Sequence, residues 1–147
     1  MTIEYRRIVP ADIGRSMAFV IEGMRPHLYP MRLSPDKIDA TFKHFMTSTS
    51  DFHLAAFDDQ RIVGGIAAVA LESPWFERCE ATVVMCRAVV PGVGRKLIAA
   101  LKAWIDGDMR IRRAFFPLEF DADPRMQRLL ARYGFSSTQV VCAYQKD

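Results

Sequence analysis

The sequence predicts an α/β domain with a mixed central sheet and helices on both faces of that sheet. In the second half of the chain each strand-like segment is followed by a helical one, which favours parallel pairing there. In the first half two strand-like segments are joined by the short turn 58–60, which favours an antiparallel hairpin. A chain of 147 residues buries about two-thirds of its unfolded surface, so we expect a single domain over residues 1–147.

The N-terminal part of the chain is expected to form one strand and two helices. The strand covers residues 2–8, and Pro10 occupies the first turn of the helix that follows it. Apolar residues at helical spacing continue this helix until prolines interrupt residues 25–32. The second helix begins at Ser34, since a serine cap followed by proline is a typical helix start.

The next elements are the two strands of the hairpin, expected over residues 52–57 and 61–71. Gly64 and Gly65 lie inside the second of these strands. Glycine within a strand indicates a bulge or a close approach of another backbone. A loop over residues 72–78 then leads to the central stretch of the chain.

The central stretch, residues 81–106, combines a strand, a glycine turn and a helix. It begins as a continuous apolar run rich in β-branched residues and turns at residues 91–94. The residues after the turn place one apolar face on a helix, and Gly107 is expected to cap its C-terminus. The residues of that face are Leu97, Ile98, Leu101, Trp104 and Ile105.

The last part of the chain is expected to add a strand, a helix and a final strand. The first strand covers residues 113–120 and contains Pro117, which has no N–H to donate to a neighbouring strand. Either a gap in the sheet or the end of a short strand explains this proline. Asp123 is expected to cap the last helix, Gly134 to end it, and residues 139–145 to form the final strand.

The glycine turn has the properties of an anion site. Gly92 and Gly94 allow the backbone to approach a ligand closely, and the helix that follows begins with free N–H groups. Arg95 and Lys96 add positive charge where the helix dipole already favours an anion. The alternative is an ordinary strand-to-helix turn that uses glycine only for tightness.

Composition excludes several classes of protein. The net charge of +3 is too small for a typical nucleic-acid-binding domain, although arginines at 110, 112 and 113 and at 125, 128 and 132 leave that reading as a third alternative. The three histidines are scattered, so no metal site is expected. Three cysteines without paired spacing and the lack of an apolar leader or membrane-length segment lead us to expect a cytoplasmic protein that does not bind membranes.

The order of elements and two short motifs resemble the GNAT acetyltransferase superfamily. That family's loop begins with Arg or Gln, continues with two residues, Gly, one residue and Gly or Ala, and opens a helix. Gly92, Val93 and Gly94 match its second half, whereas Val89 and Val90 replace the residues that usually begin it. A second match is Gly134-Phe135, at the end of the last helix.

The resemblance implies a fold, a co-substrate and a set of binding residues. In this fold the fourth and fifth strands are parallel and splay apart, and the pantetheine arm of acetyl-CoA lies between them. A proline at 117 is compatible with such a gap. The residues implied in binding are strand residues Val83, Val84 and Met85 and loop residues Val89, Val90, Gly92, Val93, Gly94, Arg95 and Lys96.

Fewer residues support a catalytic role. Transfer to an amine requires a group that accepts a proton, and Glu80 and Glu119 at strand ends are the candidate bases. A carboxylate at a strand end is, however, more often simply solvated than catalytic. The position where many family members carry a tyrosine is Leu130, and the nearby Tyr133 lies on the apolar helix face.

The leading hypothesis is therefore an acetyl-CoA-dependent N-acetyltransferase that acts by direct attack of an amine on the thioester. Its partners would be coenzyme A and a small-molecule or peptide amine, and a homodimer is left open. The alternative from another class is a non-catalytic interaction or assembly module of the same fold, loosely similar to short chains in tailed-phage genomes. Val89, Val90 and Leu130 favour that alternative, because the family has polar residues at those positions.

Overall fold

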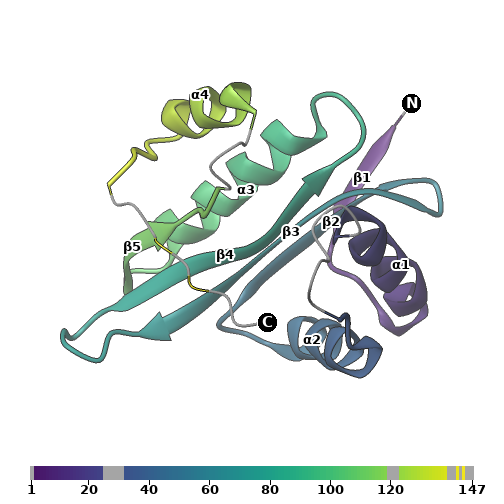
Figure 1. Cartoon of the computed structure of the whole chain (residues 1–147), viewed down its shortest axis with the longest axis horizontal. Helices are drawn as coiled ribbons and strands as arrows, with labels where there is room; N and C mark the ends of the chain where they lie inside the picture. The colour runs from purple at the N-terminus through teal and green to yellow at the C-terminus, as the bar shows by residue number, and fades with distance from the viewer. Residues whose placement is uncertain (1, 25–31, 119–122, 139–141, 143, 145–147) are drawn as a thin grey trace.

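The computed structural model contains one five-stranded sheet with helices packed on it (Figure 1). It describes all residues except 1, 25–31, 119–122, 139–141, 143 and 145–147. The strands are β1 (Ile3–Arg6), β2 (Phe52–Asp58), β3 (Arg61–Glu72), β4 (Cys79–Ala88) and β5 (Ile111–Phe115). The helices are the 3₁₀ turn η1 (Pro10–Asp12), α1 (Ile13–Met24), α2 (Pro35–Thr47), α3 (Val93–Gly107) and α4 (Pro124–Arg132).

The sheet is mixed, as the sequence predicts. Its strands lie in chain order, β1-β2-β3-β4-β5, and each of the first three neighbouring pairs is antiparallel. Among the described strands only β4 and β5 are parallel, because α3 returns the chain to the end of the sheet at which β4 begins. The β2–β3 turn contains Asp59 at a φ of 52°, in the left-handed region that Asp tolerates better than most residues.

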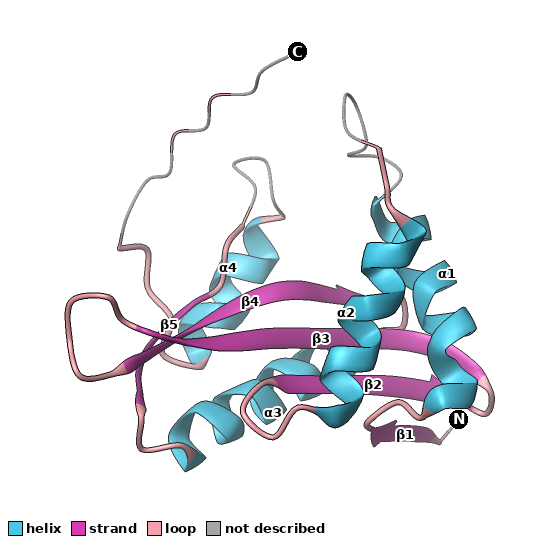
Figure 2. Ribbon diagram, turned by 90° about the horizontal axis from the view of Figure 1, so that it is seen from below, coloured by secondary structure: helices cyan, strands magenta, loops and turns pink. Residues whose placement is uncertain are grey.

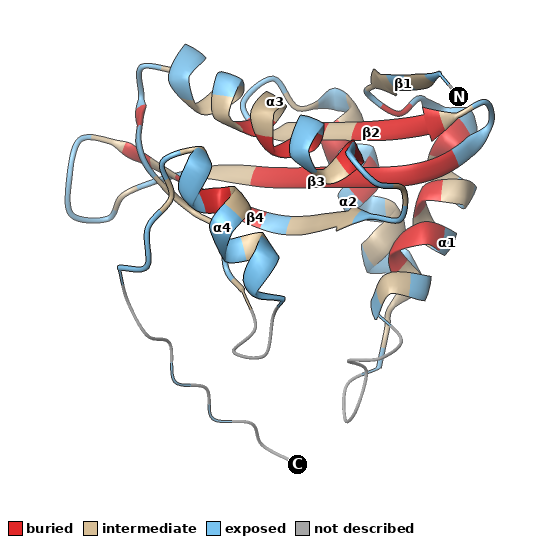
Figure 3. Ribbon diagram, turned by 90° about the horizontal axis from the view of Figure 1, so that it is seen from above, coloured by how far each residue is buried: buried red, intermediate tan, exposed pale blue. Residues whose placement is uncertain are grey.

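The helices cover both faces of the sheet. α1 and α2 lie on one face, called here the α1–α2 face, and α3 and α4 lie on the other, the α3–α4 face (Figures 1 and 2). Each face has its own hydrophobic core, one around Phe19, Phe42 and Phe57 and the other around Ile66, Leu97 and Leu101. Buried residues concentrate on β2 and β3, the strands in the middle of the sheet (Figure 3).

A buried carboxylate fastens the first helix to the sheet edge. Asp12 is 1% exposed and accepts from Arg6 of β1 at 2.7 Å, from Arg15 at 2.9 Å and from the Val9 backbone N–H at 2.8 Å. The hydrogen bonds from Arg6 hold the pKa of the Asp12 carboxyl below its usual value, against the effect of burial. The pairing therefore favours the charged form and links β1 to the start of α1.

Local signals in the sequence place several helix ends correctly. Ser34 caps α2 by accepting from the Lys37 N–H at 3.3 Å, and Asp123 caps α4 by accepting from the Arg125 N–H at 2.9 Å. Gly134 follows α4 with a φ of 88°. Gly107 is different: it is the last residue of α3, and Asp108 is the cap, so the predicted glycine cap is wrong.

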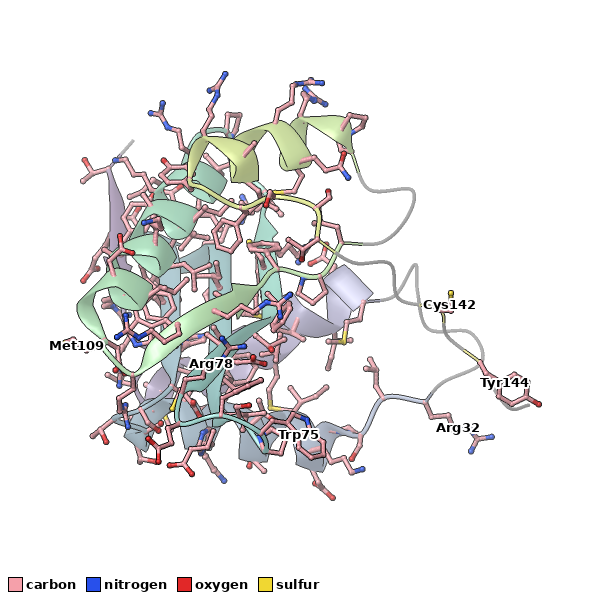
Figure 4. The ribbon with its side chains drawn as sticks, turned by 90° about the vertical axis from the view of Figure 1, so that its left-hand side faces the viewer. Arg32, Trp75, Arg78, Met109, Cys142 and Tyr144 are labelled. Carbon is pink, nitrogen blue, oxygen red and sulfur yellow. The ribbon has the colours of Figure 1, made fainter. Side chains whose placement is uncertain are left out.

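Two further expectations change near the C-terminus. The strand predicted over residues 113–120 is shorter, because β5 ends at Phe115 and leaves Pro117 exposed outside the sheet. The final strand predicted over 139–145 lies mostly outside the described residues. Within that range Cys142 and Tyr144 are described; they have no regular structure, and both project away from the sheet (Figure 4).

Candidate functional site

The site begins at the open half of β4. β5 pairs with β4 only from Cys79 to Thr82, where Thr82 faces Phe115, the last residue of β5. Within the part of the chain that the structure describes, residues 83–88 of β4 have no strand partner on that side. The fourth and fifth strands therefore splay apart, as expected, and leave backbone N–H and C=O groups of β4 available to a ligand.

A bulge marks the point where the two strands part. Ala67 of β3 faces Met85, but the next residue, Ala68, faces Val83, so Val84 is an additional residue on β4. Its side chain is 51% exposed. Bulges reorient backbone groups and are frequent next to active sites. Val83, Val84 and Met85, the three residues expected to face a cofactor, thus lie where the strand becomes accessible.

The chain then enters the glycine turn, which has room for a ligand. Gly92 has a φ of +84°, a conformation that L side chains rarely adopt, and a Cβ added there would meet nothing within 4 Å. A Cβ on Gly94 would touch only the Cβ of Ala88, at 3.6 Å. The surface over both glycines is therefore open, which suits the close approach of a phosphate group.

Free donors point out of this turn. The Val93 N–H bonds to the carbonyl of Val90, and the Lys96 N–H bonds to that of Gly92. The N–H groups of Gly94 and Arg95 have no acceptor among the described residues, as expected for the first turn of a helix. Together with the helix dipole they give this turn the donors and the positive potential that an anionic ligand requires.

Close packing fixes the position of the turn against the sheet. Gly64 of β3 lies so near α3 that an added Cβ would be 2.6 Å from Cγ1 of Val93. The neighbouring atom belongs to a side chain of α3 and not to another backbone. The register against β2 shifts at this point, with Val63 as an additional residue on β3, so the bulge predicted from Gly64 and Gly65 is present. The Val89 N–H donates to the carbonyl of Val63 at 2.9 Å, so that N–H is not available to a ligand. Val90 is half-buried and packs against the core of the α3–α4 face.

The two basic residues after the turn remain accessible. Arg95 and Lys96 are both exposed, and the ammonium of Lys96 lies 5.5 Å from the centre of the Tyr5 ring. Their charges add to the positive potential at the start of α3. Val93 is 2% exposed, so its side chain belongs to the core and only its backbone belongs to the site.

The candidate bases differ in what the structure shows. Glu80 is half-buried in the part of β4 that pairs with β5, and it accepts from Nη2 of Arg78 at 2.9 Å. Arg78 is the last residue of the β3–β4 loop, and the exposed Trp75 lies in the same loop (Figure 4). Glu80 thus lies four residues before the bulge at Val84. Glu119 lies outside the described residues.

Other groups near the open strand are poorly suited to acid–base chemistry. Burial raises the pKa of the Cys86 thiol to about 11, so the thiol stays neutral at physiological pH. Leu130, which stands where a tyrosine acid would be expected from the family resemblance, is 4% exposed and belongs to the core. Tyr133 packs against the same core.

Sequence reasoning missed one polar side chain beside the open strand. Arg87 of β4 donates from Nη1 to the carbonyl of Phe19 in α1 at 2.6 Å, and its guanidinium lies 4.4 Å from the centre of the Phe19 ring. The sequence signal for this residue was a single arginine within the otherwise largely apolar run of residues 81–90. Its contact with a helix 68 residues earlier was not visible from the sequence.

The described residues show neither a metal-binding cluster nor a membrane-spanning helix. Among the described residues no three His, Cys, Asp or Glu side chains come together in a way that would hold a metal ion. The same part of the chain contains no helix with the length and apolar character needed to cross a membrane.

Comparison with known proteins gives matches at the level of structure. No protein-family model and no curated protein matches the sequence. Glucosamine-6-phosphate N-acetyltransferase from Arabidopsis thaliana is similar in structure, with a TM-score of 0.74, 10% identity and 100% of each chain covered. The aminoglycoside N-acetyltransferase AAC(6')-Iy in complex with CoA has a TM-score of 0.70 and 18% identity over 99% of this chain and 95% of its own.

A third similar structure has a different description. It is a transcriptional regulator from Bacillus halodurans C-125, with a TM-score of 0.76, 14% identity and coverage of 99% of this chain and 100% of its own. At these identities the likeness concerns the fold. In this chain that fold is an open, mixed sheet with helices on both faces and a splayed final pair of strands.

Proposed function

We propose that this chain, which has the fold of the GNAT acetyltransferases, binds acetyl-CoA and transfers its acetyl group to an amine. The observation that carries the proposal is the continuity of the open half of β4 with the glycine turn. A strand edge with free backbone groups ends at a turn with free N–H groups, and this order suits a ligand with amide groups in one part and a diphosphate in another.

Each part of the site has a role in this proposal. Gly94 and Arg95 bind the diphosphate through their free backbone N–H groups, and Arg95 and Lys96 add two positive charges. Gly92 and Val93 hold the turn in the shape that exposes these donors. Val89 and Val90 supply an apolar wall beside it. Backbone groups of Val83, Val84 and Met85 pair with the amides of the pantetheine arm, as a neighbouring strand would.

Acetyl-CoA supplies a thioester whose carbonyl carbon an amine can attack. Backbone N–H groups near the bulge at Val84 would stabilise the oxyanion that forms. Glu80 or Glu119, directly or through water, would take the proton that the amine loses as the new amide bond forms and the C–S bond breaks. The thiolate leaves without a side-chain acid, because Leu130 occupies the position considered for one.

Isothermal titration with acetyl-CoA tests the binding part of the proposal. The Gly94→Glu variant should lose binding at least tenfold, because its carboxylate would fill and negatively charge the phosphate site. Gly94→Ala is the matched control and should retain most affinity, since its Cβ would make an ordinary 3.6 Å contact. No heat with the wild-type protein at millimolar acetyl-CoA would rule the proposal out.

A second candidate function is a non-catalytic binding module. For either function we propose that the protein acts in the cytoplasm. Val89, Val90 and Leu130 are apolar at positions where the GNAT family is polar, and one structure of this fold is described as a transcriptional regulator. Release of free thiol from acetyl-CoA in the presence of amines separates the two functions. Binding without any thiol release would favour the module.

A further inference from the structure

Arg87 is a cation held in a fixed orientation. Its guanidinium stacks on the Phe19 ring at 4.4 Å and donates to the Phe19 carbonyl at 2.6 Å. The side chain runs across Gly23 so closely that a Cβ there would be 2.6 Å from Cδ and 2.9 Å from Nε. A half-buried side chain held by a helix backbone, a ring and a glycine has few other rotamers to adopt, so the charge is preorganised.

No protein carboxylate within the described part of the chain neutralises this charge. Several other arginines have acidic partners: Arg6 and Arg15 pair with Asp12, and Arg78 pairs with Glu80. The Nε and Nη2 groups of Arg87 have no acceptor among the described residues. A half-buried cation with free donors has given up part of its hydration, and an anionic ligand would compensate for that loss.

Its position relates Arg87 to the acceptor side of the proposed reaction. Side chains alternate along β4: Cys86 packs in the core of the α3–α4 face, whereas Met85 packs in the core of the α1–α2 face. Arg87 also lies on the α1–α2 face, against α1. Because α3 and α4 cover the other face, an amine that reaches the open half of β4 approaches over the α1–α2 face.

We propose that Arg87 binds an acidic group, a carboxylate or a phosphate, on the acceptor amine, and so determines the class of acceptor. This inference rests on the proposed function of the same site. Arg87 lies three residues beyond Val84, about 10 Å along the strand. The acid and the reacting amine should therefore be several bonds apart, as in lysine or glucosamine 6-phosphate.

Two matched pairs of probes test the inference: L-lysine against cadaverine, and glucosamine 6-phosphate against glucosamine. The members of each pair differ only in the acidic group. Their affinities for the wild-type protein saturated with CoA are measured by titration calorimetry. The acid-bearing member of at least one pair should bind ten times more tightly or better. Equal affinity within both pairs, or no binding of either acid-bearing member, would overturn the inference.

Substitution of Arg87 identifies the residue responsible. Arg87→Gln should remove the preference for the acid-bearing probe over its matched partner, and Arg87→Lys should retain part of that preference. The affinity of both variants for acetyl-CoA should change less than twofold. Arg7→Gln is the matched control, because Arg7 also donates to backbone carbonyls, those of Ser48 and Asp51. Arg7 follows β1, at the edge of the sheet opposite β5 and away from the open half of β4. This variant should keep the preference, and a thermal melt of each variant monitors folding.

The outcomes separate this inference from the function on which it rests. If Arg87→Gln loses affinity for acetyl-CoA, the anion bound by Arg87 is the coenzyme diphosphate, and the acceptor assignment is wrong. If Arg87→Gln keeps the preference, Arg87 has only a structural role. If the wild-type protein binds no acetyl-CoA, the proposed function itself fails, and the inference fails with it.

Discussion

His53 of β2 is a buried titratable side chain without a hydrogen-bond partner for Nδ1 among the described residues. It is 3% exposed, stacks on Phe45 at 5.5 Å and meets the edge of Phe42 at 5.7 Å. Burial, with a smaller effect from the charge of Arg7, lowers the pKa of its imidazole to about 4. The neutral ring therefore belongs to the core of the α1–α2 face.

This burial predicts a loss of stability in mild acid. The unfolded chain protonates His53 near its ordinary pKa of 6.5, whereas the folded chain does so only near 4, so the unfolded state binds more protons between those values. The contribution of the neutral His53 ring to the free energy of unfolding is complete above pH 6.5 and falls by up to about 3 kcal/mol as the pH drops to 4. Urea unfolding at pH 7, 5.5 and 4.5 should show this slope, and His53→Phe should flatten it. An unchanged slope in the variant would contradict the assignment.

Two serines should respond in opposite ways to the same change. The Ser16 hydroxyl is buried without a partner among the described residues and lines a cavity of about 10 Å³ beside His53. Ser16→Ala should be neutral or stabilise the fold by about 1 kcal/mol, because an unsatisfied buried hydroxyl is removed. Ser34→Ala removes the α2 cap and should cost about 1 kcal/mol. Thermal melts compare them, and a destabilised Ser16→Ala would indicate that the hydroxyl has a partner, such as a water molecule.

At the scale of elements, the contact between β3 and α3 determines where the glycine turn lies, and with it the proposed anion site. Val93 begins α3 and packs over Gly64, while the Val89 N–H ties the end of β4 to Val63. Farther along, Trp104 of α3 stacks on Phe52 of β2 at 5.3 Å. The helix is thus fixed to the sheet at both ends, and the turn before it is held rigidly.

Gly64→Ala should therefore displace the start of α3. Its Cβ would lie 2.6 Å from Val93 and 3.3 Å from the Arg87 carbonyl, and neither neighbour is the end of a flexible chain. We expect a loss of about 1–3 kcal/mol in unfolding free energy, together with weaker binding of acetyl-CoA. The matched control is Gly14→Ala in α1, where an added Cβ meets nothing within 4 Å and should stabilise by about 0.5 kcal/mol. Equal stabilities for the two variants would show that the β3–α3 contact is looser than described.

At the scale of the whole molecule, the sequence predicts those features that depend on neighbouring residues. Ser34 and Asp123 each cap the helix that follows directly, and the hairpin turn at Asp59 separates two adjacent strands. These features explain why the order of elements and the mixed sheet were predicted correctly, and the resemblance to a known family supplied the splay of β4 and β5.

Features that depend on distant residues were not predicted. Pro117 was expected inside β5, but where β5 ends depends on where β4 stops pairing with it. The additional residue at Val84 shows only in the register against β3, because nothing in an apolar run distinguishes one valine from the next. The orientation of Arg87 depends on its contacts with Phe19 and Gly23, which lie in α1, far from β4 in the sequence.

The splay also predicts a pattern of hydrogen exchange. Residues 64–68 of β3 and residues 79–82 of β4 pair with a neighbouring strand on each side, and their amides should exchange slowly. Amides in residues 83–88 that face away from β3 should exchange faster and become protected when acetyl-CoA is added, as should those of Gly94 and Arg95. Mass spectrometry of peptic fragments measures both, and no added protection in these segments would place the ligand elsewhere.

The order of the strands has a consequence for how the chain folds. Because β1 to β5 lie in the sheet in the same order as in the sequence, β2 to β4 join through short loops, and only the α1–α2 and α3 segments separate neighbouring strands further. Such a topology has a low contact order for a sheet of five strands, and folding rates rise as contact order falls. We expect this chain to refold faster than a Greek-key domain of equal length.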